Sequence, residues 1–263
     1  MRRRLAVLLS FAAAFAAAPL QAAMVERTVD YEAGGTKMQG VLVYDDAVAT
    51  KRPGLVMAPD WMGMNPDQVA LARRIAGTDY VILVADVYGV DGRPGDAKQA
   101  GAASAALYKK RGELRARMQA ALAALKAEAD NAPLDGRHWG AIGFCFGGAA
   151  ALDLARSGAD IAGVVAFHAN LSTDDPALAK NIKGRVLVLH GADDRFESPE
   201  QIAAFQDEMR KAKVDWEFTS YGGAVHCFAI PTADGSNPGC RYDPEVARRA
   251  FERMHRFFDA AFM

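Results

Sequence analysis

Short apolar runs, each ended by glycine, proline or a polar loop, recur along most of this chain. Their β-branched residues and their length are typical of strands that are buried on both faces of a sheet. We expect such strands at 54–58, 80–85, in the run that ends at Phe144, and at 161–167 and 185–189, and a last strand at 215–221. Upstream, 27–31 and 37–44 alternate apolar and polar residues around Gly34 and Gly35, as an antiparallel hairpin does.

Segments of helical periodicity alternate with these strands. The expected helices are 67–76, 97–108, 113–128, 147–156, 199–211 and 244–262. We interpret Gly112 as a helix break and Lys109–Arg111 as a solvated turn, with a role in binding an anionic substrate as the less favoured alternative. Regular alternation predicts an α/β fold with a doubly wound, mostly parallel sheet and an N-terminal antiparallel hairpin.

The first residues follow a different pattern. Met1–Arg4 is basic, Leu5–Leu20 is an apolar run rich in alanine, and cleavage is expected near Ala22 or Ala23. A permanent membrane anchor is the alternative, but the run is short for a span. We therefore expect a signal peptide over 1–23, one domain over 24–263, and secretion to an oxidising compartment such as a bacterial periplasm.

Composition narrows the possible ligands. The chain has 263 residues, of which 51% are hydrophobic and 24% charged, and its formal net charge is -1. No basic stripe is interleaved with aromatic residues, so we expect no nucleic-acid partner and favour a small neutral or anionic ligand. No spacing of histidine, cysteine and acidic residues matches a metal site, so no metal or cofactor is expected. A monomer without membrane contact after signal cleavage is the default expectation.

The segment Gly143-Phe144-Cys145-Phe146-Gly147 combines an apolar strand, a sharp turn and the start of a helix. Glycines on both sides of Cys145 permit the close approach that a nucleophile elbow requires. The backbone N–H of Phe146 would then face a developing oxyanion. A buried structural cysteine is the alternative interpretation of this motif.

A nucleophilic thiol needs a base and a carboxylate that orients the base. Asp194 follows the strand 185–189, and His226 follows the strand 215–221. The order Cys145, Asp194, His226 is that of α/β-hydrolases. Other candidates follow strands or lie on helices: Asp193 competes with Asp194, His168 is a candidate for the pocket wall, and His138, His190 and His255 are expected to be structural or solvated.

The chain has an odd number of cysteines, which in a secreted protein leaves one thiol over. Cys227 and Cys240 are separated by a short, turn-rich segment and could form a disulfide, leaving Cys145 free. The alternative is that Cys227 is simply buried beside its neighbours. Spacing alone leaves both possibilities open.

Six motifs taken together resemble the dienelactone hydrolase family and span the mature chain. They are Asp60–Asn65, Asp86–Gly89, Gly143–Gly148, Gly191–Asp194, Tyr221–Phe228 and Tyr242–Pro244. The resemblance implies an α/β-hydrolase fold and a triad of Cys145, His226 and Asp194. It also implies that the backbone N–H groups of Phe146 and Trp61 form the oxyanion hole.

The same resemblance assigns Asp60, where relatives carry glutamate, to holding the resting thiol in a protonated state. Two arginines that bind the substrate carboxylate in the family correspond here to Val90 and Ile230. Arg93 and Arg241 lie nearby in sequence and are candidates to replace them. Tyr88 and Arg93 are expected, with His168, to line the substrate pocket.

These observations predict a hydrolase of small esters, lactones or thioesters that forms an acyl-cysteine intermediate. One alternative is a thiol redox protein, because an activated Cys145 is prone to oxidation and Cys227 lies beside His226 in sequence. The other is a binding protein that keeps the pocket without the chemistry.

Overall fold

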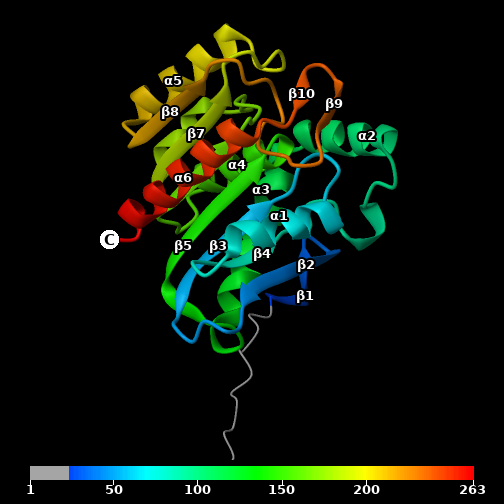
Figure 1. The fold of residues 1–263 in the computed structure, drawn as a ribbon, viewed down its shortest axis with the longest axis vertical. Helices are drawn as coiled ribbons and strands as arrows, with labels where there is room; N and C mark the ends of the chain where they lie inside the picture. Colours follow the sequence, from blue (N-terminus) through cyan, green and yellow to red (C-terminus); the bar gives the residue numbers. More distant parts are fainter. Residues whose placement is uncertain (1–23) are drawn as a thin grey trace, which may run out of the picture.

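A computed structural model describes residues 24–263, so the expected signal peptide lies outside the described residues. Within them, an eight-stranded sheet runs through the molecule (Figure 1). Its strands are β1 (Met24–Ala33), β2 (Thr36–Asp45), β3 (Arg52–Ala58), β4 (Val81–Val84), β5 (Leu134–Phe144), β6 (Gly163–Phe167), β7 (Arg185–Gly191) and β8 (Trp216–Tyr221).

The strands lie in the order β1-β2-β4-β3-β5-β6-β7-β8. β2 pairs antiparallel with both β1 and β4, and the remaining neighbours are parallel. This arrangement confirms the predicted mixed sheet with an N-terminal hairpin. The carboxyl ends of the parallel strands therefore meet at one edge, where ligands bind in open α/β sheets.

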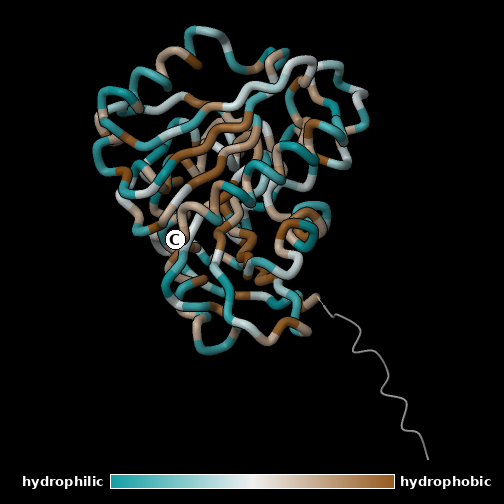
Figure 2. The backbone as a smooth tube through the Cα atoms, turned by 60° about the vertical axis from the view of Figure 1, so that its left-hand side comes forward, coloured by the Kyte–Doolittle hydropathy of each residue, from teal (hydrophilic) through white to brown (hydrophobic). Residues whose placement is uncertain are grey.

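Helices cover both faces of the sheet. Residues of α1 (Pro66–Ala76) and α6 (Pro244–Ala261) belong to one core cluster, and residues of α2 (Ala97–Tyr108), α3 (Arg111–Ala127), α4 (Phe146–Arg156) and α5 (Pro199–Ala212) belong to the other. Successive strand residues point to opposite faces, so Val56 packs in the second cluster while Leu55 and Met57 pack in the first. Figure 2 shows the hydrophobic strands enclosed by more hydrophilic segments.

Several helices begin where the sequence supplies a cap. Asn65 accepts a hydrogen bond from the backbone N–H of Gln68 at the start of α1, and Asp96 and Asp243 cap α2 and α6 in the same way. Ser198 forms a reciprocal capping box with Gln201 at the start of α5. These side chains satisfy backbone donors that a helix leaves free at its first turn.

One part of the predicted helix pattern is wrong. Gly112 lies inside α3, and the break falls at Lys109 and Lys110 instead. Arg111 is not part of a solvated turn, because its side chain is 4% exposed and its guanidinium forms an ion pair with Asp153 at 3.0 Å. A buried, paired arginine at the first position of a helix gives this segment a structural role in place of the anion-binding alternative.

The smaller elements lie outside the main sheet. A two-stranded sheet joins β9 (Asp234–Asn237) and β10 (Cys240–Arg241), in the segment where the sequence indicated only turns. Short 3₁₀ turns occur at Val90–Gly92, Glu128–Asp130 and Pro176–Asn181. No helix within residues 24–263 is long and apolar enough to cross a bilayer.

Candidate active site

Cys145 lies at a sharp corner between β5 and α4. Its backbone φ is 55°, a value that residues other than glycine rarely adopt. A Cβ added to Gly143 would lie 2.0 Å from the carbonyl oxygen of Gly147, and one added to Gly147 would lie 2.2 Å from the carbonyl oxygen of Ala58. Only glycine fits at these two positions. The turn leaves the Cys145 side chain partly exposed, at the wall of a cavity.

Asp194 and His226 meet beside this corner, although they lie in separate loops after β7 and β8. The Nδ1 atom of His226 is 2.6 Å from Oδ2 of Asp194, and the two side chains are 8% and 0% exposed. Asp193 is exposed, and its backbone N–H bonds to the carbonyl of Ala224. The structure therefore brings Asp194, rather than Asp193, to the imidazole.

The surroundings of His226 favour its protonated form. Burial alone lowers the pKa, but hydrogen bonds to the Asp194 and Cys145 side chains, together with the charges of both, raise the pKa to about 10. With Nδ1 bonded to Asp194, Nε2 is the nitrogen left to exchange a proton with the sulfur. This arrangement therefore stabilises the imidazolium once Nε2 has taken up a proton.

Two backbone N–H groups are free to bind an oxyanion. Phe146 is the first residue of α4, so its N–H has no acceptor within the helix. In the loop after β3, Met62 donates to Oδ1 of Asp60 and Gly63 donates to the Asp60 carbonyl. Within the described part of the chain, neither Phe146 nor Trp61 donates a backbone hydrogen bond, in contrast to these neighbours.

Asp60 is held by its own loop. Its Oδ1 accepts from the backbone N–H of Met62 at 2.9 Å, and its Oδ2 accepts from Nε2 of Gln68 at 3.0 Å. Among residues 24–263, no hydrogen bond joins Asp60 to Cys145. Burial raises the pKa of Asp60 to about 6. The contacts of this carboxylate thus organise the loop that carries Trp61.

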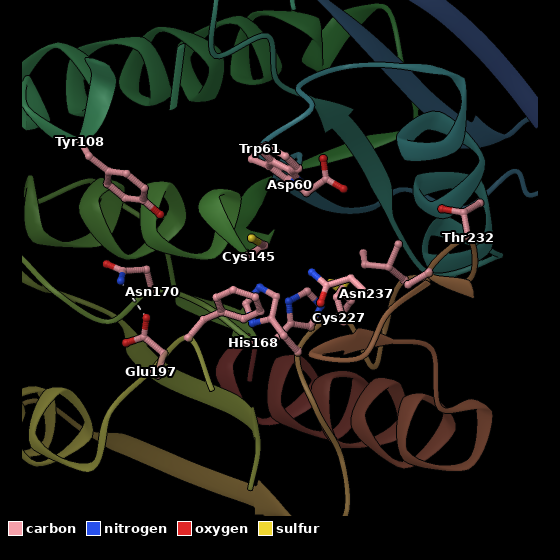
Figure 3. A pocket seen from close by; sticks show the side chains of 15 residues that line it. Asp60, Trp61, Tyr108, Cys145, His168, Asn170, Glu197, Cys227, Thr232 and Asn237 are labelled. Atoms are coloured by element: carbon pink, nitrogen blue, oxygen red, sulfur yellow. Dashed lines mark hydrogen bonds between the residues drawn. A yellow bond between two sulfur atoms is a disulfide. The ribbon is translucent and has the colours of Figure 1, made fainter. Parts of the chain in front are cut away.

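A cavity of about 590 Å³ opens over the sulfur of Cys145. Figure 3 shows Tyr108, Asn170 and Glu197 on one side of Cys145, and the segment between His226 and Cys240 on the other. That second wall includes Ile230, Thr232, Ala233 and Asn237. We did not predict Tyr108, Asn170, Phe196, Glu197 or this second wall, apart from Ile230, from the sequence. The only signal for Phe196 and Glu197 is that they follow Asp194 in a loop at a strand end.

Two residues expected in the pocket lie elsewhere. Arg93 forms an ion pair with Asp86 at 2.9 Å and donates to the carbonyl of Gln39, so it is absent from the cavity wall. Tyr88 is also absent from that wall. Its hydroxyl donates to the carbonyl of Trp61 at 2.7 Å, and its ring stacks on Phe146. Tyr88 therefore supports the backbone of the candidate oxyanion hole from behind.

No described residue replaces the missing arginines. Val90 is exposed outside the cavity, whereas Ile230 lies in its wall. Arg241 is exposed and does not line the cavity. Among the described residues that form the wall, none is lysine or arginine.

His168 does lie in the cavity wall, as expected. It is fully buried at the end of β6, with a φ of 36°, and neither ring nitrogen has a partner among the described residues. Its ring packs edge to face against that of His226, with centroids 4.9 Å apart. Burial holds the pKa of His168 well below its ordinary value.

The other three histidines lie away from the cavity and make structural contacts. His190 is buried at the end of β7 beside Phe218, and its pKa is lowered by burial. His138 contacts Asp135 within β5, and His255 stacks on Tyr80 from α6. These three side chains do not line the cavity. No group of three or more histidine, cysteine or acidic side chains in the described residues could hold a metal ion.

A disulfide joins Cys227 to Cys240, so the first of the two alternatives for these cysteines is the one observed. Cys145 remains free. The disulfide closes the segment that forms one wall of the cavity, and the N–H of Arg241 donates to the carbonyl of His226 at 3.0 Å. The cross-link thereby fixes the backbone on both sides of the imidazole.

Comparisons with known proteins agree with this architecture. The chain matches the Dienelactone hydrolase family over residues 38–262. The solved structure of m3DLH is 40% identical, with a TM-score of 0.85 and coverage of 90% of this chain and 98% of that one. The dienelactone hydrolase-like promiscuous phosphotriesterase P91 from metagenomic libraries is 39% identical, with a TM-score of 0.84 and coverage of 91% and 99%.

A curated sequence is also similar. The uncharacterized protein K02A2.1 of Caenorhabditis elegans is 35% identical over 154 residues, which are 57% of this chain and 96% of that protein. The name of that protein states no activity.

Proposed function

Because this chain belongs to the dienelactone hydrolase family, we propose that it hydrolyses small esters, lactones or thioesters through an acyl-enzyme on Cys145. The observation that carries the proposal is the arrangement at one sheet edge. A partly exposed thiol sits at a strained corner, in the wall of the same cavity as an imidazole that is bonded to a buried carboxylate. Thiol, base and orienting acid are the parts that nucleophilic acyl transfer requires.

In the proposed first half-reaction, the thiol proton passes to Nε2 of His226, and the sulfur attacks the substrate carbonyl. The carbonyl oxygen gains negative charge and accepts hydrogen bonds from the N–H groups of Phe146 and Trp61. The bond to the leaving alcohol or thiol then breaks, and His226 gives it the proton. The product of this step is an acyl-cysteine.

In the second half-reaction, water attacks the acyl-cysteine and His226 accepts its proton. Collapse of the intermediate releases the carboxylic acid and returns the proton to the sulfur. Asp194 holds Nδ1 throughout and stabilises the imidazolium that forms twice in the cycle. Asp194 is therefore a positioning residue, and Cys145 and His226 are the reacting groups.

The test is hydrolysis of a panel of esters, lactones and thioesters, beginning with nitrophenyl acetate, by the parent protein, Cys145→Ser and Cys145→Ala. We expect Cys145→Ala to lose turnover by more than about 1,000-fold, as removal of a nucleophile does in related chemistry. A phosphotriester belongs in the panel because P91 is described as a promiscuous phosphotriesterase. Hydrolysis by Cys145→Ala at the parent rate would end the proposal.

The redox alternative has lost one of the two features that favoured it. Cys227 is bonded to Cys240, so it is not available to resolve an oxidised Cys145. A protein that binds without catalysis is separated from a hydrolase by the same panel, since it would turn over none of the substrates.

A further inference from the structure

The charges around the cavity are unbalanced. Its wall includes the carboxylates of Asp60 and Glu197, and none of the described residues that form it is lysine or arginine. A third carboxylate, Asp194, lies directly behind His226. Among the described residues of the wall, His226 is the one basic group whose surroundings favour a positive charge, and it lies against the carboxylate of Asp194. An anionic substrate would therefore enter a cavity that already carries excess negative charge.

Glu197 is an unusual part of this wall. The residue is only 4% exposed, yet no lysine or arginine of the described chain forms an ion pair with it. Its Oε1 accepts from Nδ2 of Asn170 at 2.7 Å, and its Oε2 accepts from the N–H of Leu171 at 3.1 Å. Each carboxylate oxygen can accept a further hydrogen bond.

A purely structural role does not explain a carboxylate at this place. Asn170 and Leu171 need only hydrogen-bond acceptors, and a buried charge without a counter-charge is unfavourable. Near neutral pH protonation removes part of this charge, because burial raises the pKa of Glu197 to about 7, and at higher pH a cation in the cavity beside Glu197 would compensate it. Such a cation must come from outside the described chain, because the cavity wall supplies none.

The aromatic side chains of the same cavity suit a cation. Trp61 is 37% exposed and Phe196 is 54% exposed, although both line the cavity and are large apolar groups. Faces of tryptophan and phenylalanine attract ammonium groups, most strongly where the cation has lost its water. Nearby, the buried His168 presents ring nitrogens without partners among the described residues. Carboxylate and aromatic rings together form a recognition site for an ammonium group.

We propose that the substrate carries a positively charged ammonium group that binds beside Glu197, in the cavity whose wall also includes the rings of Trp61 and Phe196. Glu197 is then the residue that selects among esters, and Cys145 performs the chemistry. This inference rests on the proposed function, because it names the substrate class of that same site.

The experiment compares esters that differ only in charge. Acetylcholine and 3,3-dimethylbutyl acetate are esters of nearly the same shape, and only the first is cationic. A second pair places a trimethylammonium or a tert-butyl group in the acyl part. Assays at pH 8 keep Glu197 ionised, since burial raises its pKa to about 7. We expect kcat/KM for the cationic member to exceed that of its neutral partner by tenfold or more in at least one pair.

Glu197→Gln tests the assigned residue. The amide keeps the side-chain size and an oxygen that accepts a hydrogen bond, so we expect the cationic preference to fall by about tenfold. The preference is the ratio of kcat/KM for the cationic ester to kcat/KM for the neutral ester, measured on one variant. A general loss of activity lowers both values and leaves the ratio unchanged. Glu200→Gln is the matched control, because it removes the same charge from an exposed position in the first turn of α5. It should keep the parent preference.

The outcomes separate the two proposals. Cys145-dependent hydrolysis of nitrophenyl acetate, without a cationic preference in either pair, overturns the inference and leaves the proposed function standing. An undiminished preference in Glu197→Gln overturns the role of that residue. If no ester, lactone or thioester is hydrolysed, the proposed function fails, and ligand-observed NMR on Cys145→Ala then decides the inference. Binding of choline but not 3,3-dimethylbutanol supports it, and equal or absent binding overturns it.

Discussion

The backbone of Cys145 shows how single residues shape the candidate site. A left-handed conformation at a non-glycine residue is unfavourable by about 1–3 kcal/mol and persists only where its surroundings enforce it. Here the N–H of Cys145 donates to the carbonyl of Phe167 at 3.0 Å, and its carbonyl accepts from Gly148. The neighbouring β6 and the first turn of α4 thus hold the thiol over the cavity.

Asp194 offers a direct test at the residue scale. We expect Asp194→Asn to lower kcat for nitrophenyl acetate by about 100-fold or more, because an amide does not stabilise the imidazolium and favours the wrong tautomer of His226. The measurement is steady-state hydrolysis at pH 7.5, with circular dichroism to show that the variant is folded.

Asp193→Asn is the matched control for this prediction. It makes the same chemical change one residue earlier, at an exposed side chain that does not contact His226. Its kcat should stay within about threefold of the parent value, because substitutions at exposed positions have small effects. Equal losses in the two variants would contradict the assignment of Asp194.

Because the pKa of Asp60 is raised in the folded protein, this residue makes the free energy of unfolding fall as the pH rises. Its pKa in the folded protein is about 6, raised from 3.8 mainly by burial. Between these two values the folded state binds more protons than the unfolded state. Stability from this group is therefore greatest at low pH and falls as the pH rises toward 6.

The substitution Asp60→Asn should remove the decrease in stability that ionisation of Asp60 causes at higher pH. The amide keeps an oxygen for the N–H of Met62, and its NH₂ group can donate to Oε1 of Gln68, which has no partner among the described residues. We expect the variant to be more stable than the parent at pH 8, by on the order of 2 kcal/mol, and nearly equal to it at pH 4. Urea denaturation at both pH values measures the difference.

A nearby acidic residue serves as the control for Asp60. Asp67 lies exposed in the first turn of α1, and Asp67→Asn should give no stability gain that appears only at pH 8. A gain for Asp60→Asn that is equally large at pH 4 would mean that packing, rather than the buried charge, accounts for it.

The sequence could predict the residues that chemistry requires, but not all of those that shape the pocket. Asp194 and His226 follow strands in a chain order with a chemical meaning, and the structure brings both to one place. Glu197 carried no such signal, because its importance comes from its burial. Arg93 was misplaced because its partner, Asp86, is identified only by the folded geometry.

Among the elements, strands were easier to predict than helix boundaries. Both faces of the inner strands β4, β6 and β7 are buried, so each appears as an apolar run in the sequence, whereas the edge strand β8 is mostly half-buried and does not. The boundary between α2 and α3 was misplaced because it depends on Arg111, whose burial follows from a partner 42 residues later. Glycine is a weak helix breaker when tertiary contacts fix the backbone around it.

A buried ion network ties α3, α4 and α5 together. Arg156 is fully buried and forms two hydrogen bonds of 2.8 Å with the carboxylate of Glu208, and it also contacts Asp153 and the carbonyl of Leu171. The network therefore anchors the loop that presents Asn170 to the cavity. Its loss would affect both stability and the pocket wall.

We expect Glu208→Gln to destabilise the fold by about 3–5 kcal/mol, because it leaves the buried guanidinium of Arg156 short of negative charge. Chemical denaturation provides the measurement.

The neighbouring pair of Asp207 and Arg210 is exposed, so Asp207→Asn should cost less than about 1 kcal/mol. A similar loss in both variants would show that this buried network is no more important than a surface ion pair.

At the scale of the whole molecule, the net charge of the chain differs from the charge gathered at its cavity. The net charge of -1 favoured a neutral or anionic ligand, yet the cavity itself gathers carboxylates without a lysine or arginine in its described wall. Net charge describes solubility and long-range attraction, whereas selection depends on the few groups at the site. The same contrast applies to the fold, since one sheet edge collects residues from loops far apart in the sequence.

The disulfide connects the stability of the whole molecule to its compartment. We propose that residues 1–23 direct export and that the mature protein begins near Met24, where an oxidising environment forms the Cys227–Cys240 bond. A cross-link between residues 13 positions apart is worth about 3 kcal/mol. Mass spectrometry of the exported, unreduced protein should give the mass of the chain without residues 1–23, less the two hydrogens lost on forming the disulfide.

Reduction of the exported protein should then lower its Tm by on the order of 10 °C. Esterase activity should fall as well, because the disulfide fixes the strand whose Arg241 N–H bonds to the carbonyl of His226. The double variant Cys227→Ala, Cys240→Ala isolates the cause: its Tm should already be low and should not respond to the reductant. An equal response of the parent and the double variant would place the effect elsewhere, since Cys145 is the only other cysteine in the chain.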